Sequence, residues 1–194
     1  MALADLPANR PPNGSAPDLD SLRSPTSKAF QLAWANIPKT GFIPDKADFR
    51  AERFAPFFPI IYLIELSDDP EKRMMFRLAG QTVRDNIGLD LKGWNYANFI
   101  PEEHRTRSGI SMFRMFADPP CGRWVCKKVI HRGGHHQPVQ LTQMPMMSDS
   151  EGKRLVLGIV EGLEREPPHS PDGYFRMENV HGDHPVDIGA GLPG

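Results

Sequence analysis

The segment 153–163 restricts the possible folds most strongly, because it has the composition of a β-strand with apolar side chains on both faces. Side chains alternate between the two faces of a strand, so Leu155 and Leu157 point one way and Val156 and Val160 point the other. An antiparallel sheet with one face in water would alternate apolar and polar residues more regularly. We therefore expect a sheet that is covered on both faces, with Val156 and Val160 on its outer face.

Four other segments are predicted strands, and they fall into two pairs. A polar turn separates the members of the first pair, and Gly133 and Gly134 separate those of the second, as in β-hairpins. The four strands are predicted at residues 59–66, 74–79, 123–131 and 137–147. A short helix at 80–86 and a longer helix at 101–116 lie between the pairs. This order predicts an α+β fold with a five-stranded antiparallel sheet and helices on one face.

A further helix is predicted near the N-terminus, and we expect it to cover the other face of the sheet. Ser24 can cap its first turn, and Pro25 suits the first helical position. Apolar residues then follow at positions i, i+3, i+4 and i+7, which places them on one stripe of the helix. We expect this stripe to pack on the outer sheet face or against a second subunit. The predicted interface residues are Phe30, Ala33, Trp34 and Ile37.

The two ends of the chain differ in composition from its middle. Residues 1–23 and 165–194 are rich in proline and glycine and poor in bulky apolar residues. Such segments cannot bury enough apolar surface to offset the entropy lost on ordering. We therefore expect two disordered tails around one folded domain at residues 24–164.

Charge and cysteine usage limit the possible partners and location. The formal net charge is −1, which predicts no broad attraction to nucleic acid or to anionic lipid. No apolar run approaches the roughly 20 residues that cross a bilayer, and the N-terminus lacks the pattern of a secretory signal. The two cysteines are consistent with reduced thiols. We expect a cytoplasmic protein.

Several short motifs resemble those of one known family. They are Trp34, Pro44 with residues 49–59, Phe-Arg-Leu-Ala-Gly at 76–80 leading into Thr82 and Val83, Gly-Leu-Asp-Leu-Lys-Gly at 88–93, and Gly-Ile-Val-Glu at 158–161. With the order of elements, they make residues 29–163 resemble a PAS domain, and more narrowly a family of small bacterial PAS-like proteins, many from alphaproteobacteria. The resemblance implies a sensor or interaction module, often dimeric, which sometimes holds a small molecule between the sheet and the central helices.

These observations favour a sensory or regulatory module that acts through a signalling protein partner or as a homodimer. Whether a small-molecule ligand gates that contact is left open, and a small-molecule-binding protein with a buried apolar pocket is the alternative. A small enzyme on an α+β fold is disfavoured, because the sequence offers no set of nucleophile, base and oxyanion donors. We expect no catalytic residues.

A pocket for a small apolar ligand is predicted between the long helix and the sheet. Large apolar residues fall on inward-facing stripes there, with few charges among them. The predicted lining residues are Phe99, Met112, Phe113, Phe116, Leu141 and Leu157.

The sequence does not identify a cofactor, and we expect no zinc, haem or flavin. For zinc, Cys121 and Cys126 lie near three histidines, but residues five apart face opposite sides of a regular strand. For haem, His104 lies in a turn of charged residues, whereas an axial ligand needs an apolar wall. For flavin photochemistry, a reactive cysteine is needed in a helix, and both cysteines lie outside the helical region.

The expectation that the protein binds no zinc can be tested directly. Replacing Cys121 and Cys126 by serine should leave a folded protein, with a modest loss of stability if Cys126 is buried. Elemental analysis should find no stoichiometric zinc in the parent protein. Zinc present at one equivalent, and lost in the double variant, would contradict the expectation.

Overall fold

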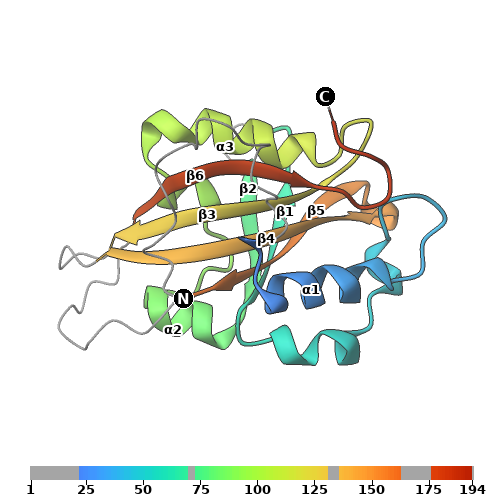
Figure 1. Cartoon of the computed structure of the whole chain (residues 1–194), viewed down its shortest axis with the longest axis horizontal. Helices are drawn as coiled ribbons and strands as arrows, with labels where there is room; N and C mark the ends of the chain where they lie inside the picture. The colour runs from blue at the N-terminus through green and yellow to red at the C-terminus, as the bar shows by residue number, and fades with distance from the viewer. Residues whose placement is uncertain (1–21, 70–72, 131–135, 163–175, 194) are drawn as a thin grey trace, which may run out of the picture.

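A computed structural model describes residues 22–69, 73–130, 136–162 and 176–193 (Figure 1). Its centre is one antiparallel sheet with the strand order β2-β1-β5-β4-β3-β6. The strands are β1 (Ile61–Leu66), β2 (Met74–Ala79), β3 (Gly122–Ile130), β4 (His136–Ser148), β5 (Lys153–Glu161) and β6 (Arg176–Val186). The predicted α+β architecture with an antiparallel sheet is confirmed.

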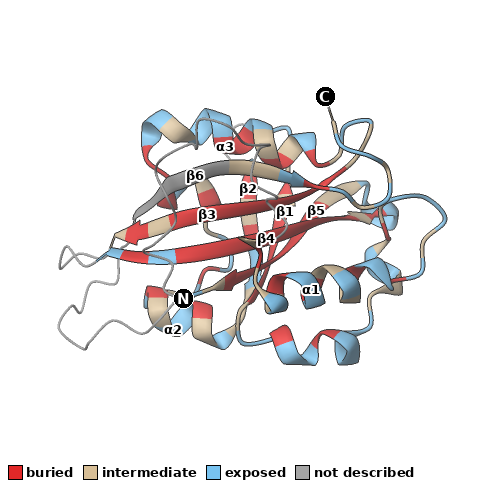
Figure 2. Cartoon of the chain, viewed as in Figure 1, coloured by how far each residue is buried: buried red, intermediate tan, exposed pale blue. Residues whose placement is uncertain are grey.

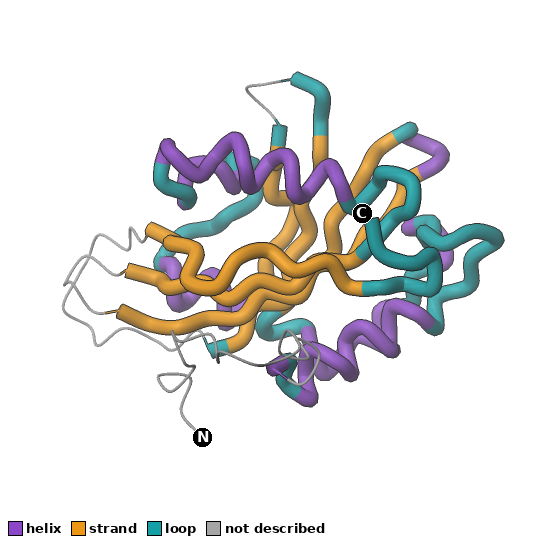
Figure 3. The backbone as a smooth tube through the Cα atoms, turned by 45° about the horizontal axis from the view of Figure 1, so that its top comes forward, coloured by secondary structure: helices purple, strands orange, loops and turns teal. Residues whose placement is uncertain are grey.

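The α-helices lie on both sides of this sheet. They are α1 (Pro25–Ala35), α2 (Gln81–Ile87) and α3 (Glu102–Arg114). Figure 3 shows α1 and α3 on opposite sides of the sheet. We call the side covered by α2 and α3 the α3 face, and the side covered by α1 the α1 face. Each face carries its own apolar core, so the sheet is buried on both sides (Figure 2).

The helices cover the opposite faces of β5 from those that the sequence predicts. Val156 and Val160 belong to the core under α2 and α3, whereas Leu155 and Leu157 belong to the core under α1. Alternation along a strand shows which residues share a face, but not which helix covers that face. The prediction that Val156 and Val160 lie on the outer face is therefore wrong.

The sixth strand, β6, lies within residues 165–194, where the sequence predicts a disordered tail. β6 pairs antiparallel with β3, from Gly122 opposite Val186 to Ile130 opposite Arg176. The backbone hydrogen bonds of such a ladder need little apolar content, which explains why composition gave no signal for a strand. The expected tail at 1–23 lies outside the described residues except for Leu22 and Arg23.

Helix α1 begins where the sequence predicts and packs on the sheet of its own chain. The Ser24 hydroxyl accepts a hydrogen bond from the backbone N–H of Ser27 at 2.8 Å, and Pro25 occupies the first turn. Phe30 and Trp34 are fully buried. The Trp34 indole donates to the Pro145 carbonyl of β4 at 2.8 Å.

A short 3-10 helix, η4 (Ala51–Phe57), completes the cover of the α1 face. The ring of Phe30 meets those of Phe54 and Phe57 edge-on, at centroid distances of 6.0 and 5.4 Å. No helix among the described residues has the length and apolar character needed to cross a membrane.

The packing of α1 predicts a large effect of one substitution. Trp34→Ala removes a side chain that is 1% exposed and leaves the Pro145 carbonyl without its donor. We expect a loss of about 3–5 kcal/mol in the free energy of unfolding, measured by urea denaturation. Leu32→Ala on the same helix, where the side chain is 64% exposed, should change stability by less than about 0.5 kcal/mol. A Trp34→Ala protein that unfolds like the parent would contradict this account of α1.

Candidate functional site

A small apolar cavity lies on the α3 face, between the sheet, α2 and the 3-10 helix η6 (Tyr96–Phe99). Its volume is about 30 Å³, which is space for one or two water-sized molecules. Pockets that bind drug-sized ligands or cofactors measure roughly 300–1,000 Å³. The lining residues are Tyr62, Phe76, Val83, Ile87, Tyr96, Phe99, Val129, Val139, Leu141 and Val160.

The structure brings only part of the predicted pocket together. Phe99 and Leu141 line the cavity, and Met112 is buried in the same core without lining it. Phe113 and Phe116 are partly buried at the margin of that core. Leu157 lies on the α1 face, so the prediction that it lines the pocket is wrong. The cause is the same as for Val156, because alternation along a strand does not show which helix covers which face.

Tyr62 is one of the cavity residues that sequence reasoning missed, and its position depends on a glycine in the neighbouring strand. A Cβ atom at position 158 would lie 2.4 Å from Cζ of Tyr62 and 2.6 Å from its hydroxyl oxygen. The phenol ring therefore lies across β5 in direct contact with the Gly158 backbone. The signal in the sequence is Gly158 itself, because a glycine inside a strand marks close approach of another group.

A buried chain of polar side chains starts at Tyr62 and ends at α3. The Tyr62 hydroxyl accepts from the Gln143 amide at 3.0 Å, and the Gln143 carbonyl accepts from the Arg123 guanidinium. Arg123 is 2% exposed, and it also donates to Asp183 of β6 at 2.5 Å. The second oxygen of Asp183 accepts from Ser111 of α3 at 2.7 Å.

The order of donors and acceptors in this chain is fixed by chemistry. A guanidinium can only donate, so Gln143 must turn its carbonyl oxygen towards Arg123 and its N–H groups towards Tyr62. Burial raises the pKa of Tyr62 well above its ordinary value, and the neighbouring Tyr96 raises it further. Tyr62 therefore stays protonated at neutral pH. We call this series, Tyr62–Gln143–Arg123–Asp183–Ser111, the polar chain.

A second polar contact lies beside the polar chain on the same face. Lys127 is 1% exposed and donates to the Tyr96 hydroxyl at 2.8 Å, with its ammonium 5.1 Å from the centre of the same ring. Arg123 and Lys127 alternate along β3 with Val125 and Val129, which face the same core. The region that the resemblance assigns to a small molecule therefore holds hydrogen-bonded polar groups as well as apolar ones.

The predicted interface residues lie in the interior of the single chain. Phe30, Trp34 and Ile37 are buried in the core of the α1 face, and Ala33 is partly buried against it. These side chains are covered by the sheet and η4 of the same chain. A surface for another protein must therefore lie elsewhere.

A second hollow lies on the α1 face beside η4, and we call it the outer groove. Its volume is about 330 Å³. Phe58 and Leu78, on its margin, are 42% and 43% exposed. The lining residues are Lys46, Phe49, Phe58, Ile61, Leu63, Leu78, Ala79, Gly80, Met146 and Leu157.

Charged residues of both signs form a network that includes Lys46, one of the residues that line the outer groove. Glu65 pairs with Arg77 at 2.6 Å and with Lys153 at 3.5 Å. Glu151 pairs with Lys153 at 2.7 Å and with Lys46 at 3.9 Å. The hydrogen bond from Arg77 holds the pKa of Glu65 below its usual value. We call these five residues the ionic rim.

The candidate metal and cofactor residues that the structure describes do not form a ligand set. Cys121 and Cys126 are buried free thiols, and burial raises the pKa of Cys126 to about 11. Among the described residues, no group of three His, Cys, Asp or Glu side chains is placed to hold a metal ion. His131 and His135 lie outside the described residues, and His104 does not line the cavity.

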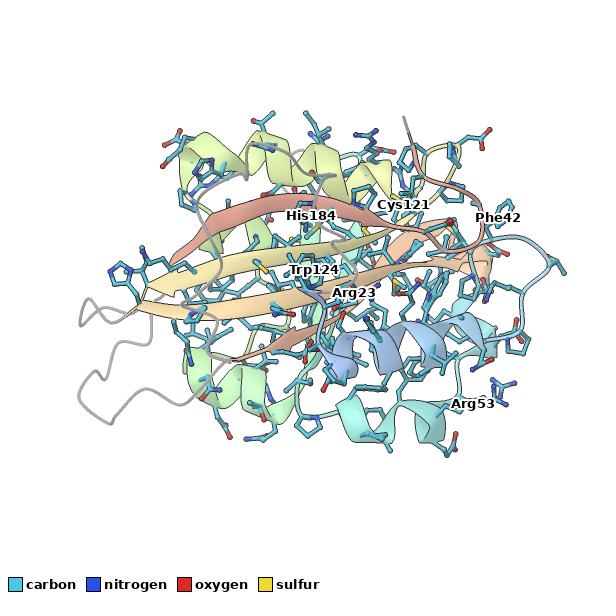
Figure 4. The ribbon with its side chains drawn as sticks, viewed as in Figure 1. Arg23, Phe42, Arg53, Cys121, Trp124 and His184 are labelled. Atoms are coloured by element: carbon cyan, nitrogen blue, oxygen red, sulfur yellow. The ribbon has the colours of Figure 1, made fainter. Side chains whose placement is uncertain are left out.

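Where β3 pairs with β6, an aromatic contact lies beside the polar chain. Figure 4 labels Trp124 and His184, which lie opposite each other on these two strands with ring centroids 5.6 Å apart. His184 follows Asp183 directly, so both side chains tie β6 to β3, one on each face of the sheet.

The contact between Tyr62 and Gly158 predicts a specific loss of stability. Gly158→Ala forces the phenol ring away from the sheet, and we expect a cost of about 1–3 kcal/mol in thermal or urea unfolding. Gly41→Ala is the matched control, because nothing lies within 4 Å of a Cβ atom at that position. In a Tyr62→Leu background, Gly158→Ala should cost much less. An equal cost in both backgrounds would contradict the proposed contact.

Comparison with known families finds a PAS domain over residues 22–161. The match runs from the start of α1 to the end of β5 and stops before β6. A search of curated proteins finds no match. Since the matched region is more than half of the 194 residues, the chain belongs to the PAS domain family.

Proposed function

We propose that this chain is a PAS regulatory module that relays the state of its α3-face core to strand β6 and acts through contact with another protein. PAS membership supports the class of function, a sensory or regulatory module. One observation supports the relay: the polar chain joins a residue of the cavity wall to a strand that lies beyond the family match.

The input of the relay is a change in the position of Tyr62. This side chain forms part of the cavity wall and lies against Gly158, so it has no free space towards the sheet. A molecule that enlarges the cavity on the side of Tyr62 would therefore push the phenol along the sheet. Such a shift breaks or strains the hydrogen bond to Gln143, which leaves a buried amide unsatisfied and is costly.

The polar chain transmits this change to β6. Gln143 holds Arg123, and Arg123 is the ion-pair partner of Asp183. The pair is almost fully shielded from water, so the loss of one partner is much more costly than at an exposed site. Ser111 extends the same contact to α3. A displaced Arg123 would therefore loosen β6 on β3.

The relay requires no catalysis and no large cofactor. The cavity of about 30 Å³ is too small for a haem or flavin in this conformation, and the wall of Tyr62 and its neighbours is closely packed. We propose that the protein is not an enzyme and that it works in the cytoplasm, where its two buried thiols would stay reduced. A small-molecule-binding protein without a protein partner is the competing function.

Hydrogen exchange tests the relay. Tyr62→Phe removes the hydroxyl at the start of the polar chain, so we expect faster backbone amide exchange in β6 than in the parent. The matched control is Val83→Ala, which changes the same cavity wall on α2 and removes no polar group. Its effect on β6 should be small.

Two outcomes would contradict the relay. One is exchange in β6 that is unchanged by Tyr62→Phe while the residues around the cavity exchange faster. The other is an equal increase in β6 for both variants, which would indicate a general loss of stability.

A further inference from the structure

A hollow that the relay does not use lies where β2 begins, beside η6 and α3, and we call it the polar hollow. Its volume is about 390 Å³, which is within the range of sites that bind small molecules. Its described lining residues belong neither to the small cavity nor to the polar chain. Its wall includes Arg73, Asn95, Asn98, Arg105, Thr106 and Gly109.

The polar hollow carries two positive charges that have no ion-pair partner. Its described lining residues include Arg73 and Arg105 but neither Asp nor Glu. In the described part of the chain, no carboxylate pairs with either guanidinium, whereas every cation of the ionic rim has a carboxylate partner. Asn98 and Thr106 add groups that can donate hydrogen bonds. The hollow therefore favours a negatively charged ligand.

Contacts within the protein hold both guanidinium groups and leave N–H groups available. Arg73 lies over the Phe113 ring at 4.8 Å from its centre, and a guanidinium over a ring keeps the N–H groups at its edge free to donate. The Nε of Arg105 donates to the Ile100 carbonyl at 3.1 Å, which leaves its two terminal amino groups. Because the two side chains are already held, less conformational entropy is lost when a ligand binds.

The two arginines lie along one stripe of α3. Residues four apart share a side of a helix, so Arg105, Gly109 and Phe113 form a single stripe. Arg73 comes from outside the helix and lies against this stripe, with its Nε 3.8 Å from the position of a Cβ atom at Gly109. One helical turn, roughly 5.4 Å along the axis, separates the stripe positions 105 and 109. Two guanidinium groups therefore meet at one end of the hollow.

Gly109 leaves the floor of the hollow open. Glycine inside a helix is destabilising relative to alanine, so its presence there needs a reason. Packing does not supply one: apart from its own helix, the described atom nearest to a Cβ at this position is Nε of Arg73, at an ordinary contact distance of 3.8 Å. A longer side chain at position 109 would project into the space between the hollow's walls. The glycine is thus explained by the space that it leaves.

We propose that the polar hollow binds the phosphate group of a small phosphorylated molecule. One guanidinium can satisfy both oxygens of a carboxylate, whereas a phosphate group has three acceptor oxygens and nearly two negative charges, which suits two guanidinium groups. The volume of about 390 Å³ leaves room for the rest of the molecule beside Asn98 and Thr106. This ligand is opposite in chemistry to the small apolar one expected from the sequence, and the site does not depend on the relay.

Isothermal titration calorimetry of the full chain tests the proposal with two pairs of probes. Adenosine 5′-monophosphate is compared with adenosine, and glycerol 3-phosphate with glycerol. We expect at least one phosphate ester to bind saturably with a Kd of about 1 mM or tighter, and its phosphate-free counterpart to bind at least tenfold more weakly. Succinate, which offers only carboxylates, should bind more weakly than that ester.

Three substitutions test the residues of the polar hollow. Arg73→Gln and Arg105→Gln should each weaken binding of the ester by about tenfold or more. Gly109→Leu should also weaken it, because the new side chain occupies the hollow. The matched control is Arg107→Gln, which makes the same charge change on α3 at an exposed position outside the hollow. Its Kd should stay within about twofold of the parent value, and thermal unfolding should show that each variant is folded.

Four results would overturn the proposal. The first is that neither ester binds with a Kd below about 10 mM. The second is that an ester and its phosphate-free counterpart bind equally, or that succinate binds more tightly than the ester. The third is that Arg107→Gln weakens binding as much as Arg73→Gln and Arg105→Gln. The fourth is binding to vesicles that contain phosphatidic acid without binding of either soluble ester, which would indicate a membrane surface as the source of the phosphate.

Discussion

The fold depends on one constraint: its sheet carries apolar side chains on both faces, so both faces must be covered. Strand β5 shows the constraint most clearly, with Val156 and Val160 in one core and Leu155 and Leu157 in the other. Helices α2 and α3 cover the first face, and α1 with η4 covers the second. Burial of Trp34 and Phe30 holds α1 in place, because a helix of 11 residues is not stable alone.

Periodic patterns in the sequence predict the elements well, since they depend on local spacing. The stripe at Phe30 and Trp34 and the strand around Leu157 lie in the expected kinds of element. The same spacing does not show which face of the sheet a helix covers, so the sequence-based prediction puts Leu157 in the wrong core. Strand β6 was missed because pairing with β3 depends on backbone groups, which composition does not reveal. The candidate site was harder to predict, because Arg123 and Gln143 are polar residues whose buried partners, Asp183 of β6 and Tyr62 of β1, lie far away in the sequence.

The two candidate surfaces of the molecule lie back to back on the same strands. Tyr62 lines the small cavity, and the adjacent Ile61 lines the outer groove. The cavity has little free volume, so a molecule that entered it would have to displace packed side chains. Gly158 removes the space into which Tyr62 could otherwise relax. The fold thus combines a small apolar cavity on one face of the sheet with a larger open groove on the other.

The most direct test of this account is to fill the cavity and observe β6. Xenon under pressure enters small apolar cavities, and the perturbation it causes can be followed by NMR for every assigned amide. The account predicts chemical-shift changes at Tyr62 and Gly158 that continue through Gln143 and Arg123 to Asp183 and His184 in β6. Changes confined to the residues that line the cavity, with β6 unaffected, would contradict the proposed relay.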